Sequence, residues 1–224
     1  MATYIARLRE QWSDPLLTAL TVLLFVMLFV IAPLQASGIF LFQAFELFFA
    51  IILIGGVFVM SGNRVAGVAM FAALVMATTG AIFRLTAPSI FDLKLFAGAW
   101  LIMGITMACV VAPAAFGSGR VTYHHIMGAI LLYLTIAVIF VALFTFVGSA
   151  VPNAFSGLAV QDSPALASNL IYFSFATLTT TGYGDIFPVH PIARSLCNLE
   201  SIFGQLYPAT LLARLVTLEI AGRG

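Results

Sequence analysis

The chain has 224 residues, of which 62% are hydrophobic and only 8% are charged. This composition excludes a soluble globular domain and is typical of a protein that crosses a membrane several times. The formal net charge of +1 gives no reason to expect nucleic acid as a partner. The two cysteines, Cys109 and Cys197, lie in apolar runs without metal-ligand spacing, which favours buried free thiols.

Six apolar runs are each near the roughly 20 residues that a helix needs to cross a bilayer. In chain order they cover residues 15–32, 39–60, 65–83, 91–112, 121–147 and 191–220. The first run is longer than the roughly 7–15 residues of a signal-peptide core, so we interpret it as a spanning helix. A polar connector at 148–168 leads into a further run, 169–179, which is too short to span. We therefore predict an all-α membrane protein with six transmembrane helices and a re-entrant loop between the fifth and sixth.

The short run is followed by a segment of small, polar and aromatic residues, Thr180-Thr181-Gly182-Tyr183-Gly184-Asp185. A dehydrated cation in a membrane needs oxygen ligands, and stacked backbone carbonyls can supply them. Such carbonyls can face one axis only if some residues leave the ordinary β and α regions, and Gly182 and Gly184 allow a positive φ without steric cost. The segment therefore predicts an ion-binding loop whose inner mouth carries the Thr180 hydroxyl. The plainer interpretation is a polar loop between two apolar helices.

This segment, with a helical run before it and a long apolar helix after it, resembles the selectivity filter of potassium channels. The chain is similar to prokaryotic six-transmembrane potassium channels with a single pore loop. The resemblance implies a pore helix at about 168–179, whose C-terminal dipole favours a cation in the central cavity. It also implies that Asp185 closes the motif at the outer mouth, and that Tyr172 and Phe173 form part of an aromatic cuff around Tyr183. The ion-binding carbonyls would belong to Thr180, Thr181, Gly182, Tyr183 and Gly184, with potassium at the first four.

One copy of this loop cannot surround an ion, and non-helical backbone at membrane depth needs protein or a water-filled cavity around it. Since the chain contains one copy, we expect a homotetramer with cyclic symmetry in which each chain supplies a quarter of the filter. Six helices place both termini on one side, and the excess of positive charge there indicates cytoplasmic termini in the cell (plasma or inner) membrane. The residues expected on that side are Arg7, Arg9, Arg64, Arg120, Arg214 and Arg223, against Arg84, Lys94 and Arg194 on the outer side.

We divide the chain into a four-helix peripheral membrane domain, residues 1–116, and a pore domain, residues 117–224. The peripheral domain stands where six-helix channels have a voltage sensor, whose fourth helix has arginines at every third position. The corresponding run, 90–112, offers Lys94 and no arginine. Moving one charge through 100 mV is worth about 2.3 kcal/mol, and steep gating needs several charges per chain. We therefore expect weak voltage dependence or none, and a structural ion pair for Glu46 in the second helix.

Glu200 lies in the upper half of the sixth helix, where a bare carboxylate would be costly. We expect it to face the pore helix and to bond to a hydroxyl such as that of Thr177 or Ser174, which would support the filter from behind. In the alternative interpretation Glu200 faces the central cavity and concentrates cations there.

The same helix contains Gly204 and, four residues later, Pro208. Proline removes a helical donor and glycine lowers the resistance to bending, so together they predict a hinge below the filter. Leu211, Leu212 and Leu215 beyond it could converge with their copies into an apolar constriction that closes by dewetting. The alternative is a static kink that only shapes a permanently open cavity.

These observations predict a potassium-selective channel that conducts passively, with no enzyme activity and no cofactor apart from the permeant potassium ions. The expected partners are three further copies of the chain and membrane lipids. A gating ligand would act on the membrane part or through a separate regulatory subunit. Two alternatives are a secondary potassium transporter, whose folds usually carry internal repeats, and a non-conducting membrane scaffold subunit that keeps a pore-like loop.

Overall fold

The computed structural model describes residues 15–38, 52, 64–86, 90–117, 122–161, 163 and 165–221. The first helix runs over Pro15–Ala36 and includes a π-helical stretch, η1 (Met27–Ile31), followed by α2 (Ala32–Ala36). The later elements are α4 (Arg64–Thr86), α5 (Ile90–Ala115), α6 (Tyr123–Ala150), β1 (Phe155–Ser156), α7 (Leu166–Leu178), β2 (Phe187–Pro188) and α8 (Pro191–Ala221). The described part is therefore helical apart from two strands of two residues each, as the sequence predicts.

Four of the described helices are long and apolar enough to cross a membrane. They are Pro15–Ala36, Arg64–Arg84, Phe91–Ala115 and Tyr123–Ala150. The expected second helix, 39–60, and its Glu46 lie outside the described residues except for Ile52. The last helix, α8, has 31 residues but is not among the four, because polar residues interrupt its apolar sequence.

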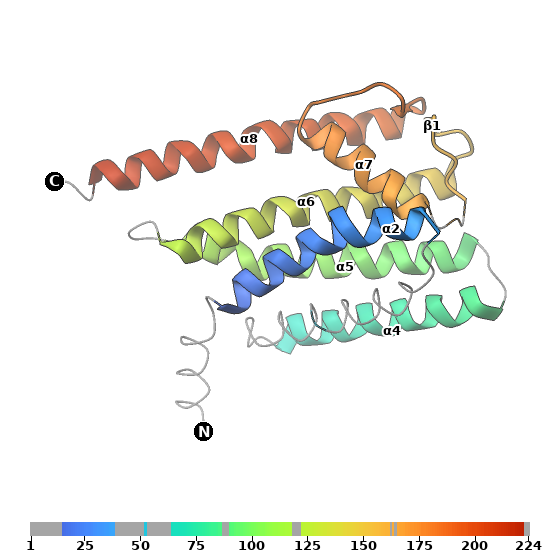
Figure 1. Ribbon diagram of the computed structural model, residues 1–224, viewed down its shortest axis with the longest axis horizontal. Helices are drawn as coiled ribbons and strands as arrows, with labels where there is room; N and C mark the ends of the chain where they lie inside the picture. The colour runs from blue at the N-terminus through green and yellow to red at the C-terminus, as the bar shows by residue number, and fades with distance from the viewer. Residues whose placement is uncertain are drawn as a thin grey trace.

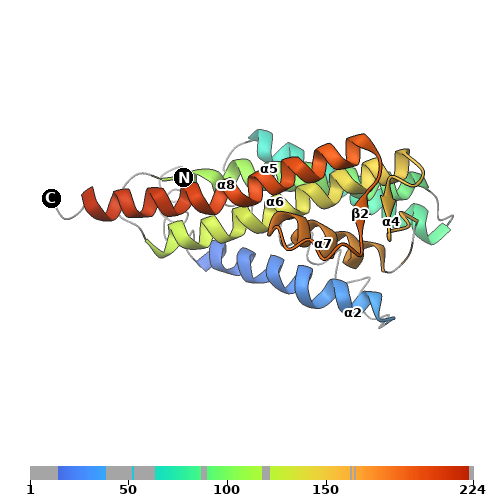
Figure 2. The same cartoon turned by 90° about the horizontal axis from the view of Figure 1, so that it is seen from above.

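The long helices lie side by side along the longest axis of the molecule, and the short α7 crosses obliquely near one end (Figures 1 and 2). Helix α6 is central, since it packs against α5, α7 and α8. Helix α4 contacts α5, and α2 contacts α7. This arrangement holds α7 between the first helix, α6 and α8.

Two buried clusters hold these layers together. The larger one joins the first helix, α4, α5 and α6, with Leu20, Met70, Met107 and Leu131 all nearly or fully inaccessible. The second one anchors α7: Phe144 of α6 is fully buried, and its ring lies 5.0 Å from that of Phe173. These large apolar side chains are closely packed, and this packing fixes the positions of the helices that carry them.

Candidate ion-conduction site

Helix α7 ends where the predicted ion-binding segment begins. The N–H groups of Thr179, Thr180 and Gly182 donate to the carbonyls of Phe175, Thr177 and Ala176, at 2.9, 3.0 and 3.1 Å. These bonds satisfy carbonyls that the last turn of a helix otherwise leaves without a partner. They also fix the direction in which the chain leaves α7.

The backbone then has a positive φ at every second residue. Gly182 has φ 56° and Gly184 has φ 82°, so the prediction for both glycines is confirmed. Thr180 also has a positive φ, 57°, which the sequence did not indicate because a β-branched residue rarely adopts this conformation. Backbone carbonyls can all face one axis only if the chain leaves ordinary strand and helix geometry, and these three positive φ angles are such a departure.

The whole segment from Thr179 to Asp185 is exposed on the single chain. A Cβ atom added to Gly182 or Gly184 would meet nothing within 4 Å. The glycines are therefore needed for their φ angles and not to avoid a clash within this chain.

The outer end of the segment is held by α7 and by the connector after α6. The Tyr172 hydroxyl donates to both carboxylate oxygens of Asp185, at 3.0 and 2.9 Å, and its ring stacks on Tyr183 with centroids 5.7 Å apart. At Gly157, an added Cβ would lie 2.0 Å from the carbonyl oxygen of Asp185, so this loop packs directly on the outer mouth.

Phe173 does not join this stack, which corrects part of the expected cuff. Its side chain is buried, and its ring packs against Phe144 and Phe155, at 5.0 and 5.5 Å between centroids. Successive residues of a helix point about 100° apart, so Tyr172 and Phe173 face different surroundings. Phe173 packs α7 against α6 and β1, whereas Tyr172 contacts the segment after α7.

One face of α8 lies along the C-terminal half of α7; we call it the α8 contact face and define it as Glu200, Ser201, Gly204 and Gln205. Glu200 accepts from Ser174 at 2.5 Å, and the Ser201 hydroxyl donates to the Thr177 carbonyl at 3.3 Å. A Cβ on Gly204 would lie 1.7 Å from the Leu178 carbonyl oxygen, and the Gln205 amide donates to the Thr180 hydroxyl at 3.0 Å. The spacing i, i+1, i+4, i+5 places all four on one side of the helix. The contacts therefore progress from the middle of α7 to the inner mouth.

Glu200 faces α7 and bonds to a hydroxyl there, as the first of the two interpretations expects, and its support of a filter stays a prediction. The side chain is fully buried, which is incompatible with the alternative that it faces an open cavity. Its partner is Ser174 and not Thr177, whose hydroxyl bonds to its own helix at the Phe173 carbonyl, 2.9 Å away. The Ser174 hydroxyl also lies 3.1 Å from the Ala137 carbonyl of α6, so one hydroxyl connects α6, α7 and α8.

The predicted gate residues have different surroundings. Pro208 lies inside a continuous α8, and Gly204 is packed against α7, so Gly204 has a close-contact role besides any hinge role. Leu211 is half-buried against the core, whereas Leu212 is exposed. These two therefore do not share one open face, and the side chain of Leu215 lies outside the described residues.

Arg214 has a role that the charge count did not reveal. Its guanidinium donates to the carbonyls of Ala115 and Phe116, at 3.2 and 2.6 Å, and also to that of Gly117. These carbonyls belong to the last residue of α5 and to the two residues after it, where a cation is favoured by the helix dipole. Arg214 thus links the inner end of α8 to the end of the peripheral helix α5.

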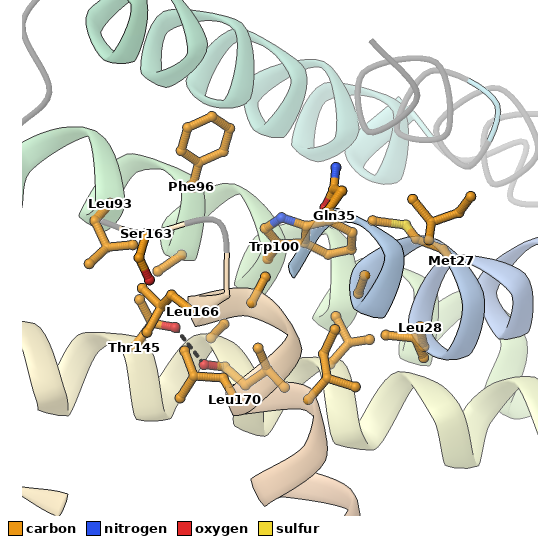
Figure 3. A pocket seen from close by; sticks show the side chains of 18 of the residues that line it. Met27, Leu28, Gln35, Leu93, Phe96, Trp100, Thr145, Ser163, Leu166 and Leu170 are labelled. Atoms are coloured by element: carbon orange, nitrogen blue, oxygen red, sulfur yellow. Dashed lines mark hydrogen bonds between the residues drawn. The ribbon is translucent and has the colours of Figure 1, made fainter. Parts of the chain in front are cut away.

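A cavity of about 130 Å³ lies behind α7, between the first helix, α5 and α6 (Figure 3). Met27, Leu28, Trp100 and Leu170 are among the residues that line it, and the Thr145 hydroxyl bonds back to its own helix at 2.8 Å. The walls are mostly apolar, so the cavity suits no dehydrated ion. The first helix contacts α7 beside this cavity, through the rings of Phe29 and Phe175, whose centroids lie 4.8 Å apart.

Comparison with known proteins points to the same region. The family model described as an ion channel matches residues 128–220, which extend from α6 into α8 and cover less than half of the chain. No curated protein and no solved structure matches the chain. Over the matched part the chain is similar to ion channels, which supports passive ion conduction, and the four apolar helices among the described residues indicate a membrane protein.

Proposed function

We propose that this protein is a potassium-selective channel whose pore is formed by four copies of the chain. The observation that supports it best is the segment after α7, with a positive φ at Thr180, Gly182 and Gly184. A loop of ordinary backbone would not need three such residues in alternation, and one of them is a β-branched residue for which the conformation is unfavourable. The segment is exposed along its length on one chain, so its ligand groups are accessible to further copies and to an ion.

A fourfold axis beside this segment gives the simplest closed arrangement. The pore needs ligands on all sides of the ion, and each chain supplies one segment. In this arrangement the carbonyls of Thr180, Thr181, Gly182, Tyr183 and Gly184 replace the hydration shell of potassium. The C-terminal end of α7 faces the inner side of the filter, where its dipole favours a cation.

The peripheral helices act as a scaffold and not as a steep voltage sensor. In α5 the basic side chain within the expected fourth helix is Lys94, which is exposed. One charge in a field of 100 mV changes the free energy by about 2.3 kcal/mol, too little for a steep response. Channel opening therefore depends on the pore domain, residues 117–224, with both termini cytoplasmic.

The test is the reversal potential of the purified protein in lipid vesicles, with potassium on one side and sodium on the other. A potassium-selective channel gives a reversal potential that corresponds to a high potassium-to-sodium permeability ratio and does not depend on other ion gradients. A secondary transporter gives a flux that follows a coupled ion, and a scaffold subunit gives no flux. Either of these results would refute the proposal.

A further inference from the structure

Gln205 makes a contact that no other α8 side chain makes within the part of the chain that the structure describes. Its Nε2 atom donates to the Thr180 hydroxyl at 3.0 Å. Glu200 and Ser201 contact α7, and Gly204 packs on the end of α7, but only Gln205 reaches a side chain of the ion-binding segment. No sequence pattern indicates this contact, because Gln205 stands 25 residues after Thr180.

The contact restricts what the Thr180 hydroxyl can do. A hydroxyl has one proton and two lone pairs, and the glutamine amide nitrogen can only donate. Gln205 therefore occupies one lone pair and fixes the position of the oxygen, which leaves the second lone pair for another partner. The Thr180 N–H is bound at the same time to the Thr177 carbonyl at 3.0 Å. Residue 180 is thus held at its backbone by α7 and at its side chain by α8.

Gln205 is itself exposed on the single chain, at the inner end of the segment. Its Oε1 atom accepts no hydrogen bond from the described residues. A polar acceptor beside the Thr180 hydroxyl suits the water molecules of a partly hydrated cation, because an ion that enters a narrow site exchanges its water ligands for protein oxygens in steps.

We propose that Gln205 is a positioning residue for the innermost cation site, and that it sets the affinity of this site by fixing the Thr180 hydroxyl. The inference rests on the proposed channel function and adds to it a residue that governs ion binding from the inner side. A net hydrogen bond of this kind changes an equilibrium by about two- to tenfold.

The experiment measures block by internal Ba²⁺, a divalent ion of nearly the size of potassium, on the reconstituted full chain. Gln205→Met keeps the length of the side chain and removes the donor. We expect it to shift the blocking concentration by about two- to tenfold. Thr180→Val removes the hydroxyl and keeps the β-branched shape. In that background Gln205→Met should have no further effect on block.

Thr217→Val is the matched control, because Thr217 is another exposed polar residue of α8, but its hydroxyl bonds to the Ala213 carbonyl of its own helix. It should leave Ba²⁺ block unchanged. If Gln205→Met does not assemble, Gln205→Asn takes its place in the comparison with Thr180→Val. Its amide is one methylene too short to reach the Thr180 hydroxyl. An equal shift in Thr217→Val, or a Gln205 effect that persists in Thr180→Val, would overturn the inference alone. Wild-type protein that passes no potassium current would overturn the channel proposal together with it.

Discussion

Replacing Gly204 by alanine should separate α8 from the pore helix. An added Cβ would lie 1.7 Å from the carbonyl oxygen of Leu178, and this atom belongs to the backbone, so no side-chain rotation relieves the contact. Helix α8 or the end of α7 must withdraw by about 1.3 Å before the separation reaches even 3.0 Å. Overpacking of this kind costs about 1–3 kcal/mol or more, whereas the higher helix propensity of alanine returns up to about 1 kcal/mol.

The displaced carbonyl lies two residues before Thr180, so the ion-binding segment should move with it. We expect Gly204→Ala to lower the thermal stability of the assembled protein and to reduce potassium selectivity. Gly98→Ala is the matched control, because this α5 glycine faces the terminal methyl group of Met76 at 2.6 Å, and a flexible side chain can turn away. An unchanged melting temperature together with an unchanged reversal potential in Gly204→Ala would refute the reasoning.

Four further predictions concern other parts of the molecule. Gly182→Ala should disturb the positive φ and Tyr183→Ala should remove the stack on Tyr172, so each variant should lose potassium selectivity or current in measurements of reversal potential. An unaltered permeability ratio in both variants would reject the filter assignment. Glu200→Gln should retain assembly and internal cation block, because a buried neutral side chain of the same shape can still accept from its serine partner; a clear loss of internal block would instead place the carboxylate at the cavity. Open probability should vary shallowly with voltage in single-channel recordings, and a curve as steep as that of arginine-rich channels would contradict the scaffold role of the peripheral helices. Arg214→Gln should remove the charged donor at the end of α5 and shift the balance of open and closed states without changing selectivity. Identical gating in the variant and the wild-type protein would show that the contact between Arg214 and the end of α5 is only structural.

The gate also gives a testable contrast. If Gly204 and Pro208 form a hinge, Pro208→Ala alone should stiffen α8 and change open probability, because it restores the missing backbone donor without adding a group near α7. The double replacement by alanine would mix this effect with the clash at Leu178 and is therefore less informative. Unaltered open probability in Pro208→Ala would leave the ion-binding segment itself as the gate.

The sequence by itself determined the elements and the position of the site. Apolar runs of about 20 residues predict spanning helices because a bilayer leaves few alternatives for the backbone. In the described part, the expected runs 65–83, 91–112 and 191–220 correspond to α4, α5 and α8 within three residues at either end. The positive φ values of Gly182 and Gly184 followed from local chemistry, since glycine is the residue that adopts them freely.

Tertiary structure alone decided which side chains meet. The choice of Ser174 as the partner of Glu200, the bond from Gln205 to Thr180 and the close approach at Gly204 all depend on how α8 lies against α7. Contacts between residues about 25 positions apart are set by the packing of two helices, and neither helix carries that information in its own periodicity. The positive φ of Thr180 has the same origin, because the surrounding contacts stabilise a conformation that the residue type disfavours.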